Sequence, residues 1–231
     1  MFGSYVAGLL YAASAWVLPI LIAITFHEAA HGFVAWRLGD DTAYRLGRVT
    51  FNPLRHVDPF GTVLLPALLL LIRAPFLFGY AKPVPVRFDR LRAPRRDMVL
   101  VAAAGPAINI ALALVSAVLI HLAVGLPAVA ADWSVQTLAN SVRLNLVLAV
   151  FNMLPLPPLD GGRVAVGLLP RTLALPLARL ERWGMPILIG LLFLLPMAGE
   201  QLGLDLDILG WLVGVPVQYL LRLIVAIVGL G

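Results

Sequence analysis

Two histidines and one glutamate of this chain have the type and spacing that can hold and use a metal ion. They lie in the run 23–31, which reads AITFHEAAH. Residues four apart lie on one face of a helix, about 6 Å along its axis, so both imidazoles can reach one zinc ion. The sequence therefore predicts that His27 and His31 bind zinc and that Glu28, beside the metal, handles a proton.

The composition around this motif is that of an integral membrane protein. Hydrophobic residues make up 61% of the 231 residues and charged residues 13%, whereas a soluble domain of this length would carry about twice that charge. The mean hydropathy is +0.95. Ionisable groups at membrane depth are costly, which favours a functional metal site over the alternative, a pair of core histidines. The chain has no cysteine, so metal ligands must be histidines and carboxylates.

Six apolar segments predict an all-α integral membrane protein with five to six transmembrane helices, in a single domain over residues 1–231. The segments are 5–38, 60–72, 98–124, 135–154, 184–198 and 208–230. The second segment is too short for a comfortable span, and Pro83 and Pro85 make the following stretch, 76–86, extended. We therefore predict a short re-entrant helix with an extended return, which together form a hairpin beside the metal site. The alternation over Leu46–Phe51 predicts a short strand.

The basic residues are distributed as determinants of membrane topology. The net charge is +5, but 14 of the 17 Lys and Arg residues lie in 37–59, 82–96 and 163–182, whereas 126–136 and 199–207 have none. The positive-inside rule places the first three regions in the cytoplasm and the other two outside, and the pattern excludes nucleic acid as a partner. The N-terminus is then outside. We expect a multi-pass protein of the cell (inner) membrane, with its active site toward the cytoplasmic side.

A second stretch, far along the chain, offers a third metal ligand. It runs from Asn152 to Arg163 and reads NMLPLPPLDGGR, in which prolines break the preceding helix and glycines let the backbone turn closely. Asp160 is thereby presented on irregular chain near membrane-buried segments; the alternative is that it caps the following helix. Because the HExxH motif lacks its third ligand, we favour Asp160 as a metal ligand. His56 is a candidate fourth ligand, although a surface or hydrogen-bonding role is favoured for it.

Three protein ligands leave the fourth position of a zinc ion open, which is the arrangement of a catalytic site. Zinc makes water more acidic and polarises a carbonyl group, and Glu28 can take a proton from water and pass it to a leaving amine. A nearby donor, Asn152 or Asn109, can assist in stabilising the oxyanion. The reaction class that these residues fit is peptide hydrolysis.

Several motifs in order resemble those of the site-2 proteases, a family of intramembrane zinc metalloproteases, in its short prokaryotic branch without a PDZ domain. The run 27–31 matches the family's HExxH, and 152–161 matches its N-x-x-P-x-P-x-L-D-G. The segments 58–62, 81–86 and 105–109 look like those of the short branch. The resemblance covers residues 16–170, and the last two apolar segments carry no motif of the family.

The resemblance implies zinc as cofactor, with His27, His31 and Asp160 as its ligands and Glu28 as the catalytic residue. It implies that Asn152 helps to hold the substrate or the oxyanion, and that the substrates are transmembrane helices, cleaved within or near the bilayer. Such a helix must first unwind, and an extended edge at 84–86 or 49–51 can then pair with the unwound strand. Nothing in the sequence predicts an oligomeric state.

Two other functions fit parts of the sequence. A membrane zinc transporter can also carry HExxH-like motifs on its helices, but transport needs successive polar sites along a path. The apolar segments here offer one such cluster, with scattered asparagines besides. A catalytically silent membrane chaperone or scaffold is disfavoured by the intact Glu28 and its three neighbouring ligands.

Overall fold

All regular structure that the computed structural model describes is helical, which confirms the all-α prediction. The described residues are 2–64, 68, 71 and 81–230. In chain order the elements are α1 (Phe2–Arg37), α2 (Thr42–Arg45), η1 (Pro53–Arg55), η2 (Pro59–Leu64), η3 (Phe88–Arg90), α4 (Pro94–Ala123), α5 (Ala128–Asn152), α6 (Asp160–Leu168), α7 (Arg171–Arg179), α8 (Glu181–Ile189), η4 (Gly190–Leu194), α9 (Leu195–Leu202) and α10 (Ile208–Val228).

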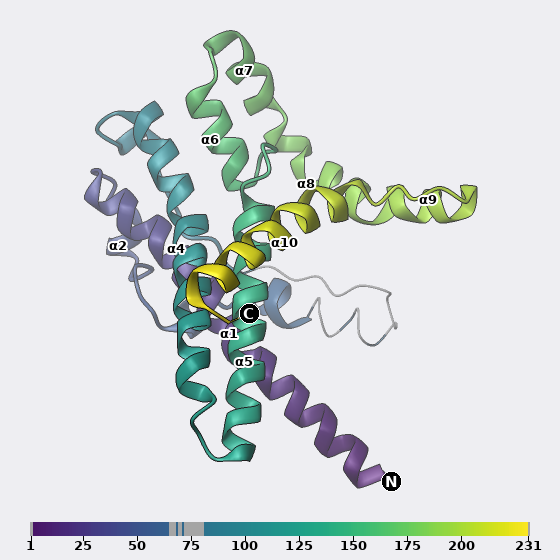
Figure 1. Cartoon of the computed structure of the whole chain (residues 1–231). Helices are drawn as coiled ribbons and strands as arrows, with labels where there is room; N and C mark the ends of the chain where they lie inside the picture. Colours follow the sequence, from purple (N-terminus) through teal and green to yellow (C-terminus); the bar gives the residue numbers. More distant parts are fainter. Residues whose placement is uncertain (1, 65–67, 69–70, 72–80, 231) are drawn as a thin grey trace.

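Helices α1, α4 and α5 pack together as the central bundle, and α6 packs against α4 (Figure 1). Small residues allow this close approach. Ala113 and Ala117 of α4 are buried against Val142 and Leu146 of α5, and Ile224 of α10 completes the cluster. The bundle thereby fixes the second half of α1 beside the first half of α4, where the metal-binding motif lies.

Among the described residues, four helices are long and apolar enough to cross a bilayer. They are Leu10–Arg37, Pro94–Ala123, Glu181–Leu202 and Ile208–Val228. Helix α5 is not among them, and its polar residues Thr137, Ser141 and Asn145 are buried inside the bundle. Because an inward polar face is compatible with a membrane span, α5 remains a predicted span, and the total of five to six remains a prediction.

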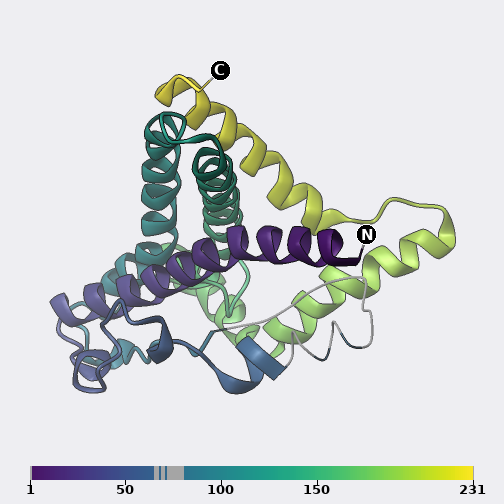
Figure 2. The ribbon, with the colours of Figure 1, turned by 90° about the horizontal axis from the view of Figure 1, so that it is seen from below.

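The fifth apolar segment is longer than the sequence predicts. Residues Glu181–Leu202 form one helical run of α8, η4 and α9, which extends outward from the bundle, and α10 returns to pack against α5 and α4 (Figure 2). Few residues of these two runs are buried. The exposed apolar surfaces of these two runs are suited to contact with lipid.

The predicted strand at Leu46–Phe51 is wrong. These residues form turns after α2, and Gly47 has φ +64°, a left-handed conformation that does not continue a strand. Arg48 is buried whereas Leu46 is 59% exposed, although residues two apart would share one face of a strand. Short-range alternation is a weak signal when no neighbouring strand is there to pair with it.

The predicted hairpin over 60–86 lies in part outside the described residues. Residues Pro59–Leu64 form the π-helix η2, and 81–87 have no helical structure, as Pro83 and Pro85 require. The re-entrant path of this segment therefore stays a prediction.

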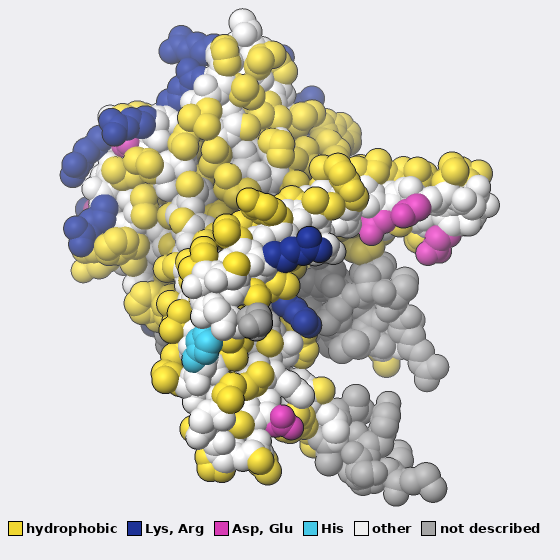
Figure 3. Space-filling view, viewed as in Figure 1, with side chains coloured by type: hydrophobic (Ala, Val, Ile, Leu, Met, Phe, Trp, Pro, Cys, Tyr) yellow, Lys and Arg dark blue, Asp and Glu magenta, His cyan; other side chains and the backbone are white. Residues whose placement is uncertain are grey.

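The basic side chains gather mainly at one end of the molecule. Figure 3 shows Lys and Arg over the end that carries α2, the start of α4, and α6 with α7. This end is built from the three basic regions that the positive-inside rule places in the cytoplasm.

Candidate metal centre and catalytic site

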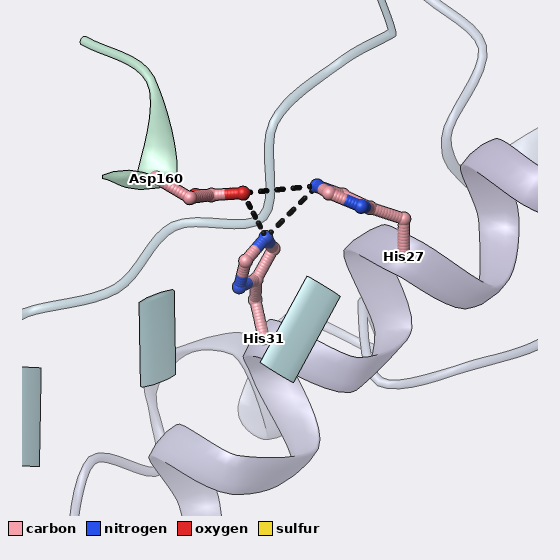
Figure 4. Close-up of side chains that lie close together, drawn as sticks. All are labelled: His27, His31 and Asp160. Atoms are coloured by element: carbon pink, nitrogen blue, oxygen red, sulfur yellow. Dashed lines mark hydrogen bonds and ion pairs between the residues drawn. The ribbon is translucent and has the colours of Figure 1, made fainter. Parts of the chain in front are cut away.

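The structure brings the three predicted ligands together, two from α1 and one from the start of α6 (Figure 4). The Nε2 atoms of His27 and His31 lie 3.1 Å apart. Oδ2 of Asp160 lies 3.2 Å from the first and 3.3 Å from the second. All three side chains are buried.

Three features of this cluster fit a zinc ion. Ligand atoms bound tetrahedrally at about 2.0–2.1 Å from zinc lie about 3.3 Å from one another, close to the separations found here. Oδ2 of Asp160 is buried and has no hydrogen-bond donor within the described chain. A Cβ on Gly105 of α4 would come within 2.4 Å of His31 Nε2, so glycine keeps this space free of side chain. Two imidazole nitrogens and a carboxylate oxygen that face one another at these distances suit a cation between them.

The other ring nitrogen of each histidine is held by an acceptor on α4. His31 Nδ1 donates to the carbonyl oxygen of Val101 (2.7 Å), and His27 Nδ1 donates to Oδ1 of Asn109 (2.6 Å). With the proton on Nδ1, the lone pair of each ring is on Nε2 and faces the cluster. The sequence interpretation of Asn109 as an oxyanion donor is wrong, because its amide group is used inside the bundle.

Asp160 is the first residue of α6, which corrects the prediction of an irregular position. Its Oδ2 has no hydrogen-bond partner in the described chain and lies toward the two histidines (Figure 4). The following glycines allow this placement. A Cβ on Gly161 would lie 2.2 Å from the carbonyl oxygen of Met153, and one on Gly162 would lie 2.2 Å from Pro157 N. The proline-broken chain and the start of α6 therefore pack backbone to backbone.

His56 is not part of the cluster. Among the described residues, the group with metal-binding spacing is His27, His31 and Asp160. His56 is buried rather than on the surface, and its Nε2 bonds the carbonyl oxygen of Thr50 (3.0 Å). The hydrogen-bonding role predicted for it is confirmed.

Glu28 lies beside the ligands and is held by backbone. Its Oε2 accepts a hydrogen bond from the N–H of Val84 at 2.7 Å, and no other hydrogen bond to its carboxylate is found within the described chain. The second carboxylate oxygen is thus available to a reacting molecule.

A cavity of about 280 Å³ opens next to His27 and Glu28. Its walls come from α1, the start of the segment 81–87, α5, the loop before α6, α8 and η4. They are mostly apolar, with Ile24, Leu148, Phe151, Leu159, Leu188, Ile189 and Leu192 among them. Asn152 lines the same cavity, and its Nδ2 donates to Leu148 O of its own helix at 3.0 Å. The structure thus places Asn152 near Glu28 but not against the three ligands.

The segment 81–87, which carries Val84, is tied down at several points. Arg48 donates through Nη2 to the carbonyl oxygens of Lys82 (2.6 Å) and Pro83 (3.3 Å), and Lys82 N–H donates to His56 O. Because Pro83 and Pro85 lack an N–H and that of Val84 is given to Glu28, a substrate strand finds few donors along 83–85. Pairing at this edge stays a prediction, with less support than the sequence suggested.

Comparison with known proteins gives the family. The model of "Peptidase family M50" matches residues 119–195. "Putative zinc metalloprotease YwhC" of Bacillus subtilis (strain 168) is 40% identical over 191 residues, which are 80% of this chain and 83% of that protein. The chain belongs to peptidase family M50, the site-2 proteases.

Two further relatives of this site-2 protease share the name "Putative zinc metalloprotease Rip2". The protein of Mycolicibacterium smegmatis is 33% identical over 190 residues, 82% of this chain and 69% of that protein. The protein of Mycobacterium tuberculosis (strain H37Rv) is 35% identical over 141 residues, 61% of this chain and 52% of that protein. No solved structure matches the chain at a significant level.

Family membership makes the chain a membrane metalloprotease, and the names of the relatives identify zinc as its cofactor. The donor set of two imidazoles and a carboxylate agrees with that metal. The sequence did not single out Val84 N–H, the carbonyl of Val101 or the open space at Gly105 as parts of this site-2 protease centre. These are contacts between elements, and only the packing of α1 against α4 and the 81–87 segment creates them.

Proposed function

We propose that this protein is an intramembrane endopeptidase that hydrolyses peptide bonds within or near the transmembrane segments of membrane proteins. The observation that carries the proposal is the meeting of two imidazoles and one carboxylate beside Glu28, at the wall of an apolar cavity. A bound zinc ion supplies a Lewis acid that makes water more acidic and polarises a peptide carbonyl.

The chain's own residues perform the remaining tasks. His27, His31 and Asp160 hold the metal. Glu28, fixed through Oε2 by Val84 N–H, takes a proton from the attacking water on its other oxygen and passes it to the leaving amine. Asn152, on the cavity wall, helps to hold the substrate backbone by turning its amide from Leu148 O toward the peptide.

The cavity supports a transmembrane helix as the substrate. Its apolar walls suit the aliphatic side chains of a membrane-spanning segment. Apart from the polar groups near the metal ligands, few polar groups line the cavity. A helix keeps its carbonyl groups in internal hydrogen bonds, so the bound part must be unwound before cleavage. We propose that the active site faces the cytoplasmic half of the inner membrane, because the ligands lie in the second half of α1 and at the start of α6, next to the basic regions 37–59 and 163–182.

The test is Glu28→Gln, measured for both zinc content and cleavage of model transmembrane peptides. Glutamine cannot accept the proton, so cleavage should fall at least about 100-fold while bound zinc stays close to one ion per chain. Asp160→Ala should lose both zinc and cleavage. The matched control is Glu200→Gln, an exposed glutamate on α9 away from the cavity, which should leave both unchanged.

Two results would contradict this function. Cleavage by Glu28→Gln at the wild-type rate would remove Glu28 from the chemistry. Normal zinc transport across vesicles by Glu28→Gln, with no cleavage by the wild type, would favour a transporter instead.

A further inference from the structure

A chain of hydrogen-bonded, buried polar side chains leads from the metal ligand His27 into the bundle. Asn109 and Asn145 are both completely buried, and Nδ2 of Asn109 donates to Oδ1 of Asn145 at 2.7 Å. Nδ2 of Asn145 donates to the carbonyl oxygen of Ser141 (2.9 Å) and approaches its hydroxyl (3.3 Å). The site's own chemistry uses neither asparagine.

The carbonyl of Ser141, at the end of this chain of hydrogen bonds, determines which atom of each asparagine donates and which accepts. A backbone carbonyl can only accept a hydrogen bond, so the atom of Asn145 that faces Ser141 O must be the NH₂ group. Its Oδ1 must therefore face Asn109, which then has to present its own NH₂ group there. Asn109 Nδ2 also reaches the carbonyl of Ala23 at 3.4 Å, a second acceptor on the same side.

The orientation of Asn109 in turn decides the proton position on His27. With its NH₂ group turned to Asn145, Asn109 has only Oδ1 left for His27 Nδ1 at 2.6 Å. An acceptor at Nδ1 keeps the proton there and leaves the Nε2 lone pair directed at the metal. A flipped Asn109 would offer its NH₂ group instead, and the proton would move to Nε2.

We propose that Asn145 is a positioning residue for the zinc site, acting through Asn109 to hold His27 in its metal-binding tautomer. This inference rests on the proposed zinc site and deepens it. Neither asparagine contacts the metal or the substrate. The carbonyl of Ala23 favours the same orientation of Asn109 through a long contact (3.4 Å), and Asn145, anchored on Ser141 O, provides the short hydrogen bond (2.7 Å) that selects it.

The test is a double-mutant cycle on the full-length protein in detergent, read as the dissociation constant for zinc in competition with a chelator. Asn145→Leu removes the acceptor that orients Asn109 and should weaken zinc binding about 10-fold, the low end of the effect for outer partners of a ligand. Asn109→Leu removes the side chain through which Asn145 acts on His27. In the Asn109→Leu background, Asn145→Leu should therefore change zinc affinity less than about 2-fold.

A conservative variant and a control separate positioning from packing. Asn145→Asp keeps the acceptor for Asn109 Nδ2, so it should bind zinc more tightly than Asn145→Leu, although its buried charge makes the fold less stable. Ser116→Ala removes the hydroxyl that bonds Ser141 Oγ (2.8 Å) but leaves Ser141 O in place, and zinc affinity should not change. If Asn145→Leu does not fold, Asn145→Ala takes its place in the cycle.

The outcomes are distinct. An equal loss of affinity from Asn145→Leu in both backgrounds would overturn the relay, as would an unchanged affinity in Asn145→Leu alone. If the wild-type protein binds no zinc, the proposed function itself is overturned, and this result is obtained before any variant of the double-mutant cycle is measured.

Discussion

At the scale of single residues, Gly105 decides whether the two histidines can share a metal. It lies on α4, facing α1, and its missing side chain leaves room for His31 Nε2 and for Cε1 and Nε2 of His27. The three atoms lie 2.4–2.7 Å from where a Cβ would be, well inside van der Waals contact. A methyl group there would push both imidazoles out of place.

We expect Gly105→Ala to abolish zinc binding while the helical fold remains. Alanine is favoured over glycine in a helix by about 0.5–1 kcal/mol, so α4 itself should not be weakened. Zinc content by elemental analysis and helicity by circular dichroism check the two halves of this expectation.

Gly214→Ala on α10 is the matched control, because a Cβ there meets nothing within 4 Å. It should keep zinc and be as stable as the wild type or more so. A zinc-loaded Gly105→Ala protein would show that α1 and α4 are further apart than this packing requires.

The residues of the site differ in how far the sequence reveals them. His27, Glu28 and His31 follow from spacing within one helix, which local geometry fixes. Asp160 follows only by joining two distant stretches, and the sequence misplaced it on irregular chain. Gly105 and Asn145 act through contacts between helices, and no spacing along the chain encodes which atoms meet there.

At the scale of elements, the segment 81–87 is held in place partly by the turn that follows α1. Asp40 is completely buried in that turn. Its Oδ1 accepts from Thr42 N–H (3.0 Å) and from the Thr42 hydroxyl, and its Oδ2 accepts from Arg87 N–H at 2.6 Å. One carboxylate thus ties the end of α1 to the segment whose Val84 holds Glu28.

Because of these hydrogen bonds, the contribution of Asp40 to the free energy of unfolding depends on pH. Burial acts to raise the pKa of the Asp40 carboxyl, but hydrogen bonds from Thr42 and Arg87 outweigh it, and the pKa lies below its usual value. A depressed folded-state pKa contributes stability above the unfolded pKa, and the contribution is lost as pH falls through the folded value.

Asp40→Asn should therefore destabilise the protein by about 1–3 kcal/mol at pH 7, because one of its two acceptor groups becomes a donor and the charge is lost. The difference from the wild type should shrink below about pH 4, where the unfolded carboxyl takes up its proton. Thermal unfolding at both pH values measures it. Asp132→Asn, at an exposed position, should show neither effect. A pH-independent difference would count against the charged hydrogen bonds.

Elements follow from the sequence where length and apolar content decide them. The long helices α1, α4 and α10 match their apolar segments closely. The strand at Leu46–Phe51 failed because alternation says nothing about a partner strand. Helix α5 is longer at its N-terminus than its apolar segment, since its polar residues are accommodated inside the bundle.

At the scale of the whole molecule, charge is distributed unevenly between the two ends of the bundle. The basic side chains cluster at the end formed by α2, the start of α4, and α6 with α7, whereas the turn between α4 and α5 carries none (Figure 3). Basic loops are retained in the cytoplasm during insertion, so this asymmetry predicts one orientation. That orientation also requires α5 to cross the membrane, although its hydropathy alone does not mark it as a span.

Single cysteines can test orientation and span count together, because the chain has no cysteine of its own. Val129 (82% exposed) and Leu202 (70%) lie in the regions predicted to be outside, and Leu54 (79%) and Leu175 (60%) in those predicted to be inside. Val129→Cys and Leu202→Cys should react with a membrane-impermeant maleimide on intact spheroplasts. Leu54→Cys and Leu175→Cys should react only after the membrane is opened.

The comparison of Val129→Cys with Leu175→Cys is decisive for α5. If both react from the same side, α5 does not cross, and the metal ligands of α1 and α6 cannot both face the cytoplasmic half of the bilayer with the N-terminus outside. If all four positions react in the reverse pattern, the basic end faces outward and the site opens to the periplasmic half. Cleavage activity of each variant, measured in parallel, shows that the labelled protein keeps its fold.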